Sequence, residues 1–213
     1  MHRGGDLYGV VNDAVAWALE IAADDSHGYD QGSREGPDYD CSSFVSWAYY
    51  RAGLRTRPGG YSPSTGEMYE VFTAAGFSDV TGQVSFASGA GLRKGDVLLR
   101  PGHHTEMMCD DDHTVGAHQN EDGGITGGKT GDQTGDEISV QSYRNKSWVY
   151  CLRYPSDPAP PPDTSQPGSR AEVIDGSARA WMYCYGGSPG LGMSRGGEDA
   201  YWDFEAFQRL CGG

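Results

Sequence analysis

The sequence predicts an α+β domain in which helices come first and an antiparallel sheet follows. Up to about residue 75, apolar residues recur every three or four positions, as on one face of a helix. From about residue 96 they form short runs separated by glycine- and aspartate-rich turns, which is the pattern of strands. Helices followed by strands, rather than alternating with them, indicate the α+β class.

Three helices are expected in the first part of the chain. Gly53 and Gly76 are typical C-terminal stops for the second and third, and Pro63 precedes the third. A polar loop separates the first two. The predicted helices cover roughly residues 6–23, a segment that carries Cys41 in its first turn and ends at Gly53, and residues 64–75.

About five strands are expected after the helices. The run Asp96-Val97-Leu98-Leu99-Arg100 is compact and apolar, and the turn 110–112 is acidic, so the segments on either side of that turn form a plausible pair. The predicted strands are residues 96–100, 104–109, 113–118, 137–141 and 148–154.

A domain boundary is expected near residue 155. Six of the eleven prolines lie between Pro155 and Pro167, which is typical of a semi-rigid linker. The sequence therefore predicts a first domain over residues 1–154, a linker over residues 155–169 and a small segment over residues 170–213. This last segment is rich in glycine and aromatic residues, and is interpreted as a wall-binding module or part of one. Its aromatic residues either stack on sugars or form the core of a very small module.

Composition excludes several function classes. The net charge is −14 and only three of the 16 basic residues are lysines, which argues against a nucleic-acid partner. No window of 18 residues is apolar, so no membrane span is expected, and no secretory signal is visible. Five cysteines without CxxC spacing indicate neither a disulfide framework nor a zinc site. No cofactor is expected.

Cys41 is the strongest candidate for chemistry. A cysteine in the first turn of a helix meets unpaired N–H groups and the positive end of the helix dipole, which lower the thiol pKa and favour a nucleophilic thiolate. The alternative is an inert buried thiol, because free cysteine packs as a small hydrophobic residue. The surroundings of Cys41 must therefore decide between the two.

A cysteine nucleophile needs a base and a group that orients that base. Of the six histidines, His104 and His118 fall on two strands predicted to pair. Side chains alternate along a strand, so His104, Glu106 and Met108 share one face. Cys41, His104 and His118 then form a nucleophile, a base and an orienting group. Each histidine taken alone is equally consistent with a structural or surface role.

Five motifs in a fixed order give these residues a family context. The chain resembles the NlpC-type, papain-like cell-wall hydrolases, and among them most closely the bacteriophage peptidoglycan amidases, or endolysins. The resemblance covers about residues 7–154. The motifs are Asp40-Cys41-Ser42-Ser43-Phe44-Val45, Lys94-Gly95-Asp96-Val97-Leu98, Gly102-His103-His104-Thr105-Glu106-Met107, Gly116-Ala117-His118-Gln119-Asn120-Glu121 and Gly131-Asp132-Gln133-Thr134-Gly135-Asp136-Glu137.

The resemblance implies a papain-like fold and a role for each matching residue. Cys41 is the nucleophile, His104 the general base and acid, and His118 the orienting residue. His103 is the alternative base, and Asn120 is the alternative orienting residue. The backbone N–H of Cys41 is expected to donate to the oxyanion. The residues expected to meet the substrate are Tyr29, Asp40, Ser42, Asn120 and Gln133.

Two segments imitate other sites. Residues 123–130 match the phosphate-binding pattern G-x-x-x-x-G-K-[ST], but a polar stretch precedes them and a glycine-rich one follows, so neither the strand nor the helix that this loop requires is expected. A mobile loop at the rim of the cleft is the better interpretation, and no nucleotide is expected. The residues between Cys109 and His113 fit no standard metal spacing, and no metal is expected.

The sequence thus predicts a phage or prophage endolysin that hydrolyses an amide bond of bacterial peptidoglycan through a cysteine. N-acetylmuramoyl-L-alanine amidase activity is favoured by the resemblance, with gamma-D-glutamyl-diamino acid endopeptidase activity as the alternative. A non-catalytic wall-binding protein and an acyltransferase on the same fold remain open. The protein is expected to be made in the bacterial cytoplasm and to act at the cell wall after release or lysis.

Overall fold

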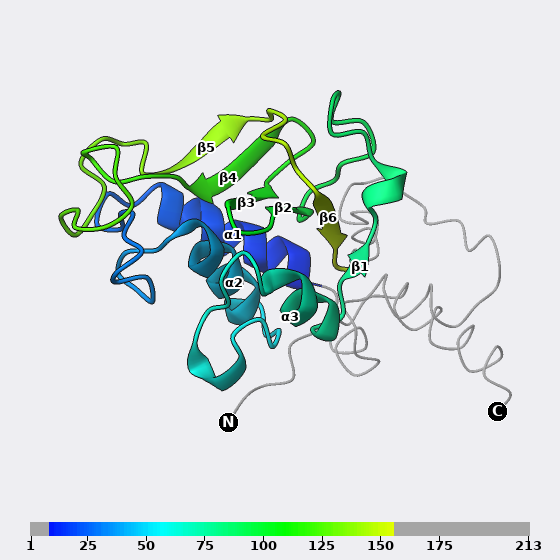
Figure 1. Cartoon of the computed structure of the whole chain (residues 1–213), viewed down its shortest axis with the longest axis horizontal. Coiled ribbons are helices and arrows are strands. Elements are labelled where there is room, and N and C mark those ends of the chain that lie inside the picture. Colours follow the sequence, from blue (N-terminus) through cyan, green and yellow to red (C-terminus); the bar gives the residue numbers. More distant parts are fainter. Residues whose placement is uncertain (1–8, 156–213) are drawn as a thin grey trace, which may run out of the picture. The chain divides into compact units, whose positions relative to one another are not determined.

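The computed structural model describes residues 9–155, and these form the predicted α+β domain (Figure 1). The helices are α1 (Val10–Ala22), α2 (Cys41–Arg51) and α3 (Met68–Ala74), with short 3-10 turns η1 (Pro58–Gly60) and η2 (Thr81–Gln83). The strands are β1 (Ser78–Asp79), β2 (Val97–Arg100), β3 (His104–Met108), β4 (His113–Ala117), β5 (Ile138–Ser142) and β6 (Tyr150–Arg153).

The sheet has six strands, not the predicted five, in the order β1-β6-β2-β3-β4-β5. The missed strand, β1, is only two residues long and exposed on both, so it carries no apolar alternation to detect. All neighbouring pairs are antiparallel. The register places Arg100 opposite His104, and Gly116 opposite Ser139.

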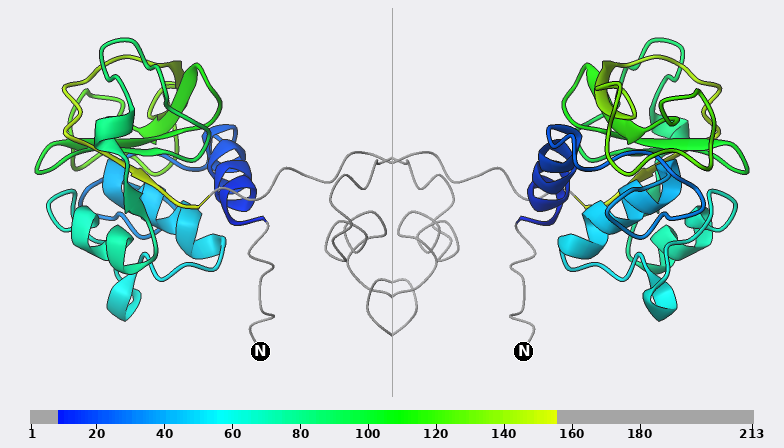
Figure 2. Two further views of the ribbon diagram at one scale, coloured as in Figure 1. Left: turned by 90° about the vertical axis from the view of Figure 1, so that its right-hand side faces the viewer. Right: turned by 90° about the vertical axis from the view of Figure 1, so that its left-hand side faces the viewer.

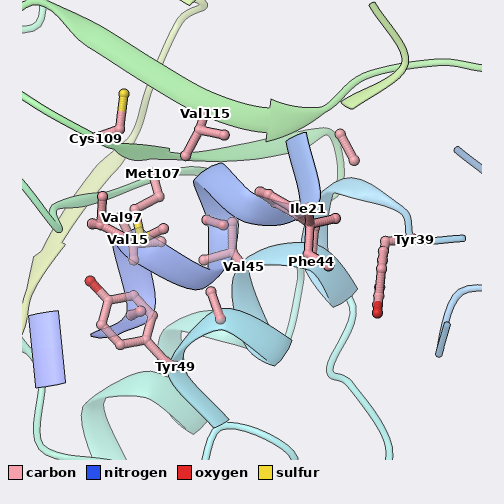
Figure 3. Close-up of a cluster of buried hydrophobic side chains, with 14 of the residues drawn as sticks. Val15, Ile21, Tyr39, Phe44, Val45, Tyr49, Val97, Met107, Cys109 and Val115 are labelled. Atoms are coloured by element: carbon pink, nitrogen blue, oxygen red, sulfur yellow. The ribbon is translucent and has the colours of Figure 1, made fainter. Parts of the chain in front are cut away.

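The helices α1 and α2 pack together on one face of the sheet (Figures 1 and 2). Side chains from both fill the space beneath the strands, where Phe44 and Val45 of α2 meet Val97, Met107 and others (Figure 3). The opposite face carries a smaller buried cluster. Its members are Val80, Leu92, Leu98, Met108, Trp148 and Cys151. Strand β3 therefore contributes to both cores, with Met107 facing the helices and Met108 facing away.

The start of α2 is fixed by its own sequence. Asp40 is the N-cap, and its Oδ1 accepts the backbone N–H of Ser43 at 2.7 Å. Ser43 Oγ in turn accepts the backbone N–H of Asp40 at 2.9 Å, which completes a capping box. The helix therefore begins at Cys41, which confirms the prediction that this residue lies in the first turn.

The Lys-Gly-Asp motif joins the sheet to α1. Gly95 has φ +85°, and an added Cβ would collide with the side chain of Val11 on α1, so only glycine fits. The next residue, Asp96, is fully buried and receives Arg153 of β6 in a two-point ion pair, with Nε–Oδ1 and Nη2–Oδ2 distances of 2.6 Å. The motif thus serves architecture rather than chemistry.

The remaining differences from the predictions lie at element ends. The helix predicted over residues 64–75 begins at Met68, because residues 64–67 form a turn in which Glu67 accepts the N–H and hydroxyl of Ser64. The predicted linker, apart from its first residue, and the segment 170–213 lie outside the described residues. No helix within residues 9–155 is long and apolar enough to cross a membrane.

Candidate active site

Cys41 lies buried at the first position of α2, with 4% of its surface exposed. Burial raises the pKa of its thiol to about 12, and the charge of Asp40 adds to the effect. The backbone N–H groups of Thr105 and Ser42 favour the thiolate but do not outweigh burial. The predicted lowering of the Cys41 pKa is therefore wrong for the free protein, because loss of solvation exceeds the influence of the helix terminus.

Tyr29 lies near enough to Cys41 for the charge of a Cys41 thiolate to act on its phenol. Its phenol is buried, and its pKa is raised to about 12, first by burial and second by the negative charge that Cys41 carries in its thiolate form. The Tyr29 hydroxyl accepts a hydrogen bond from Gln31 Nε2 at 3.2 Å. The structure thus places a neutral phenol beside the thiol.

His104 is the first residue of β3 and directly precedes Thr105, whose N–H meets the Cys41 sulfur. The Nε2 atom of His104 lies 3.0 Å from Oε1 of Glu106, two residues along the same face of the strand. Nδ1 is therefore the ring nitrogen of His104 that is not paired with Glu106. His103, by contrast, is exposed in the turn before the strand.

Glu106 was not predicted to have a role, yet it lies at the centre of a cluster of charged and polar side chains that also contains His104, His118 and Lys146. It is 1% exposed, and the ammonium of Lys146 contacts the same Oε1 that binds His104. Burial pushes the pKa of Glu106 up, but the His104 hydrogen bond and the Lys146 charge prevail and bring it down to about 2. Glu106 is therefore a carboxylate at neutral pH.

Gly116 on β4 makes room for this carboxylate. A Cβ at Gly116 would lie 2.9 Å from Cγ of Glu106 and 3.5 Å from Cε1 of His118. Any side chain there would displace Glu106 or the ring of His118. The glycine is a positional requirement that a motif alone does not reveal.

His118 lies beyond Glu106 and does not bond to His104. The two ring centroids are 5.9 Å apart, and Nδ1 of His118 lies 3.5 Å from Oε1 of Glu106. Burial lowers the pKa of His118 to about 4, despite the opposing charge of Glu106. His118 is therefore neutral at physiological pH, and its Nε2 has no hydrogen-bond partner within the described residues.

Asp40 and Ser42, predicted to meet the substrate, turn their polar atoms into the protein. Arg34 binds Asp40 through a 2.7 Å Nε–Oδ2 contact and donates to Ser42 Oγ at 2.7 Å. Ser42 Oγ also donates to Asp40 Oδ1. These contacts give both residues a structural role at the helix start, and substrate contact by them stays a prediction.

Asn120 and Gln133 lie in the loop between β4 and β5. Oδ1 of Asn120 accepts the N–H of Gly124 at 2.7 Å, and Nδ2 donates to the Thr126 carbonyl. Its amide is thus engaged with the loop and not with His104. Gln133 Nε2 donates to the Thr130 carbonyl, and a contact with substrate remains a prediction for both residues.

The loop between β4 and β5 is tied to the loop that carries Tyr29. Oδ1 of Asp38 accepts the N–H of Gly28 at 2.9 Å and of Gly131 at 3.0 Å. Glu137 accepts the N–H of Tyr29 at 3.1 Å. The phosphate-loop look-alike within this loop leads into β5 without a helix, so the context that a phosphate site requires is missing between residues 118 and 142.

Within residues 9–155, one group has the spacing to hold a metal ion. His104, Glu106 and His118 each offer a ligand atom, and these atoms lie within 4.8 Å of one another. The ammonium of Lys146 already contacts the shared carboxylate and would repel a cation. The charge arrangement suits an ion pair better than a metal.

The neutral state of His118 predicts a loss of stability in acid. Its folded pKa of about 4 lies below its ordinary 6.5, so the unfolded chain binds more protons between these values. The contribution of His118 to the free energy of unfolding is complete above pH 6.5. It is lost as the pH drops toward 4, and the loss amounts to about 3 kcal/mol in total. Urea unfolding at pH 7, 5.5 and 4 should show this fall in the parent protein and not in His118→Gln. His103→Gln, which changes an exposed histidine, should lose stability with falling pH as the parent does. If all three proteins lose stability equally as the pH falls, His118 is not the group responsible.

The fold and this site define a class: an α+β protein with a candidate cysteine–histidine hydrolase site, in which a helix-start cysteine meets a strand bearing a histidine–carboxylate pair. More particularly, the chain belongs to the endolysin-like domain family, whose model matches residues 35–115 and 114–159. The match confirms the endolysin-like family that the motifs predict.

Among solved structures, one that the chain matches is that of the peptidoglycan hydrolase RipB from Mycobacterium tuberculosis. The two share 18% sequence identity with a TM-score of 0.40, over 72% of this chain and 73% of that one. No curated protein matches the chain.

Proposed function

We propose that this protein is an endolysin that hydrolyses an amide bond of bacterial peptidoglycan, with Cys41 as nucleophile and His104 as base. The observation that supports this most directly is the meeting of α2 and β3. The sulfur of Cys41 contacts the backbone of Thr105, and the preceding His104 is held by a buried carboxylate. Membership in the endolysin-like family supports the choice of substrate.

The proposed reaction begins from a neutral thiol. Because the pKa of Cys41 is high in the free protein, Nδ1 of His104 takes the thiol proton as the sulfur attacks the amide carbon. The carbonyl oxygen becomes an oxyanion that accepts the backbone N–H of Cys41. The imidazolium returns its proton to the leaving amine as the C–N bond breaks, which leaves a thioester.

Hydrolysis of the thioester restores the enzyme. His104, again neutral, takes a proton from water, and the resulting hydroxide adds to the thioester carbon. The second oxyanion collapses, the C–S bond breaks, and the thiolate recovers its proton from His104. The products are a free carboxylate and a free amine, so one water is consumed for each bond cut.

Within this function we propose N-acetylmuramoyl-L-alanine amidase activity, on the resemblance to the phage amidase group. The test is mass spectrometry of purified peptidoglycan digested by the parent protein, by Cys41→Ser and by Cys109→Ser. The Cys109 thiol is buried directly after β3 and donates to the His113 carbonyl at 3.4 Å, so Cys109→Ser serves as the matched control. New alanine N-termini, formed by the parent and by Cys109→Ser and not by Cys41→Ser, are expected.

Other products identify the alternatives. New N-termini at the third stem residue would indicate endopeptidase activity instead of amidase activity. Equal digestion by Cys41→Ser and by the parent would contradict the role of Cys41 as nucleophile. Binding to the wall without any new terminus would indicate a non-catalytic wall-binding protein.

A further inference from the structure

We propose that Glu106, rather than His118, is the residue that positions the catalytic base, and that Lys146 and Trp148 hold this pair from the segment between β5 and β6. The inference rests on the proposed function, because it assigns His104 the role of base. It gives Glu106 a positioning role and not a catalytic one, since Glu106 acts through His104.

Distance separates the two candidates for this role. Oε1 of Glu106 lies 3.0 Å from Nε2 of His104, which is a hydrogen bond, whereas the rings of the two histidines lie 5.9 Å apart between centroids. A carboxylate on Nε2 fixes the tautomer that leaves Nδ1 without a proton, and it stabilises the imidazolium that forms when Nδ1 takes one. A neutral His118 supplies no charge for this purpose.

Lys146 explains how a carboxylate persists in so buried a place. An isolated buried carboxylate would be too costly to ionise and would take up a proton. The ammonium of Lys146 contacts Glu106 directly and also lies 3.3 Å from Oε1 of Gln141. It is one of only three lysines in the chain. The groups that face Glu106 are therefore His104 on β3, His118 after β4, and Lys146 on the segment before β6.

Trp148 supports the other side of the base. Its ring stacks on that of His104, with centroids 6.0 Å apart and planes inclined by 19°. The indole is 5% exposed, and its Nε1 donates to the Arg144 carbonyl at 3.1 Å. The same short segment thus delivers a cation to the carboxylate and an aromatic face to the imidazole, which fixes the ring of His104 from two directions.

The first test uses Glu106→Gln, which keeps the shape of the side chain and removes its charge. We expect kcat/KM for peptidoglycan hydrolysis to fall by about 10²–10⁴-fold with little change in KM, because the charge matters only when the imidazolium forms. For His118→Gln we expect kcat/KM to fall by less than about tenfold. Equal losses in the two variants, or the larger loss in His118→Gln, would return the orienting role to His118.

The second test needs no substrate and so separates this inference from the proposed function. Alkylation of Cys41 by iodoacetamide, followed by mass spectrometry from pH 6 to pH 10, reports how readily the thiol loses its proton to His104. At neutral pH the rate should drop at least about tenfold in Glu106→Gln, since an opposite charge at this distance shifts a proton equilibrium by that much or more. An unchanged alkylation profile overturns the positioning role even if hydrolysis is lost. Hydrolysis by Cys41→Ser would instead overturn the proposed function.

Lys146 variants keep the proposal testable if Glu106→Gln does not fold. Lys146→Met should move the rise of the pH–rate profile to higher pH, because Glu106 then takes up a proton more easily. Lys146→Arg keeps the charge and should restore the parent profile. Identical profiles for Lys146→Met and Lys146→Arg would show that the ammonium only packs against the strand.

Discussion

Replacing His104 with glutamine is expected to lower kcat/KM for peptidoglycan hydrolysis by about 10³-fold or more, the largest loss of activity after that of Cys41 itself. The glutamine side chain is not basic enough to accept the Cys41 proton. Neither the attack on the amide nor the hydrolysis of the thioester is therefore assisted. The loss should appear in kcat, since His104 acts on the reacting atoms rather than on the rest of the wall peptide.

The neighbouring His103→Gln is the matched control. His103 is exposed in the turn before β3, and its backbone N–H donates to the Arg100 carbonyl, which the substitution leaves in place. Activity within about threefold of the parent is expected, because surface substitutions of this kind rarely change the fold. Loss of activity in His103→Gln with retention in His104→Gln would exchange their roles. The assay is release of soluble fragments from purified wall at several substrate concentrations.

Arg153→Met is expected to cost about 3–5 kcal/mol of unfolding free energy, the largest loss of stability predicted for this domain. The substitution leaves the carboxylate of Asp96 fully buried with its two-point partner removed. It also removes the Arg153 donor to the Gly91 carbonyl. Methionine keeps the volume of the side chain, so the effect measures the unpaired charge rather than a cavity.

Urea unfolding at pH 7 measures this cost, with Arg144→Met as the control. The side chain of Arg144 is exposed, and its Trp148 contact uses only the backbone, so a change within about 0.5 kcal/mol is expected. A double variant with Asp96→Asn should recover part of the stability, because the uncompensated charge is then absent. Equal stability of Arg153→Met and Arg144→Met would show that the ion pair contributes nothing net.

Local signals in the sequence account for the parts of the fold that were predicted. The start of α2 at Cys41 follows from Asp40 and Ser43, which satisfy the helix terminus within four residues. The strands β2 to β6 carry enough apolar residues to be recognised. By contrast, β1 exists only because Ser78 and Asp79 meet β6, and nothing in their own sequence demands it.

The candidate site was predicted where motifs define it and missed where distant segments meet. Alternation along β3 placed Glu106 beside His104, but its partner Lys146 lies 40 positions away and belongs to no motif. The pKa of Cys41 was predicted from its helix position alone, and burial by the sheet reverses the sign. Both failures have one cause: burial and charge pairing depend on the tertiary contacts of the segment, which periodicity does not encode.

Asp38 has a consequence for how such an enzyme can be redesigned. One carboxylate oxygen receives the amides of Gly28 and Gly131, so two loops separated by about a hundred residues share a single anchor. Gly28 leaves no space for a side chain beside the Gly131 carbonyl, and Tyr29 follows immediately. Grafting either loop from a relative without the other would break the Asp38 anchor. It would also displace the Tyr29 phenol from its place near the Cys41 thiol. The two loops are therefore coupled through Asp38, and engineering either one means exchanging both at once.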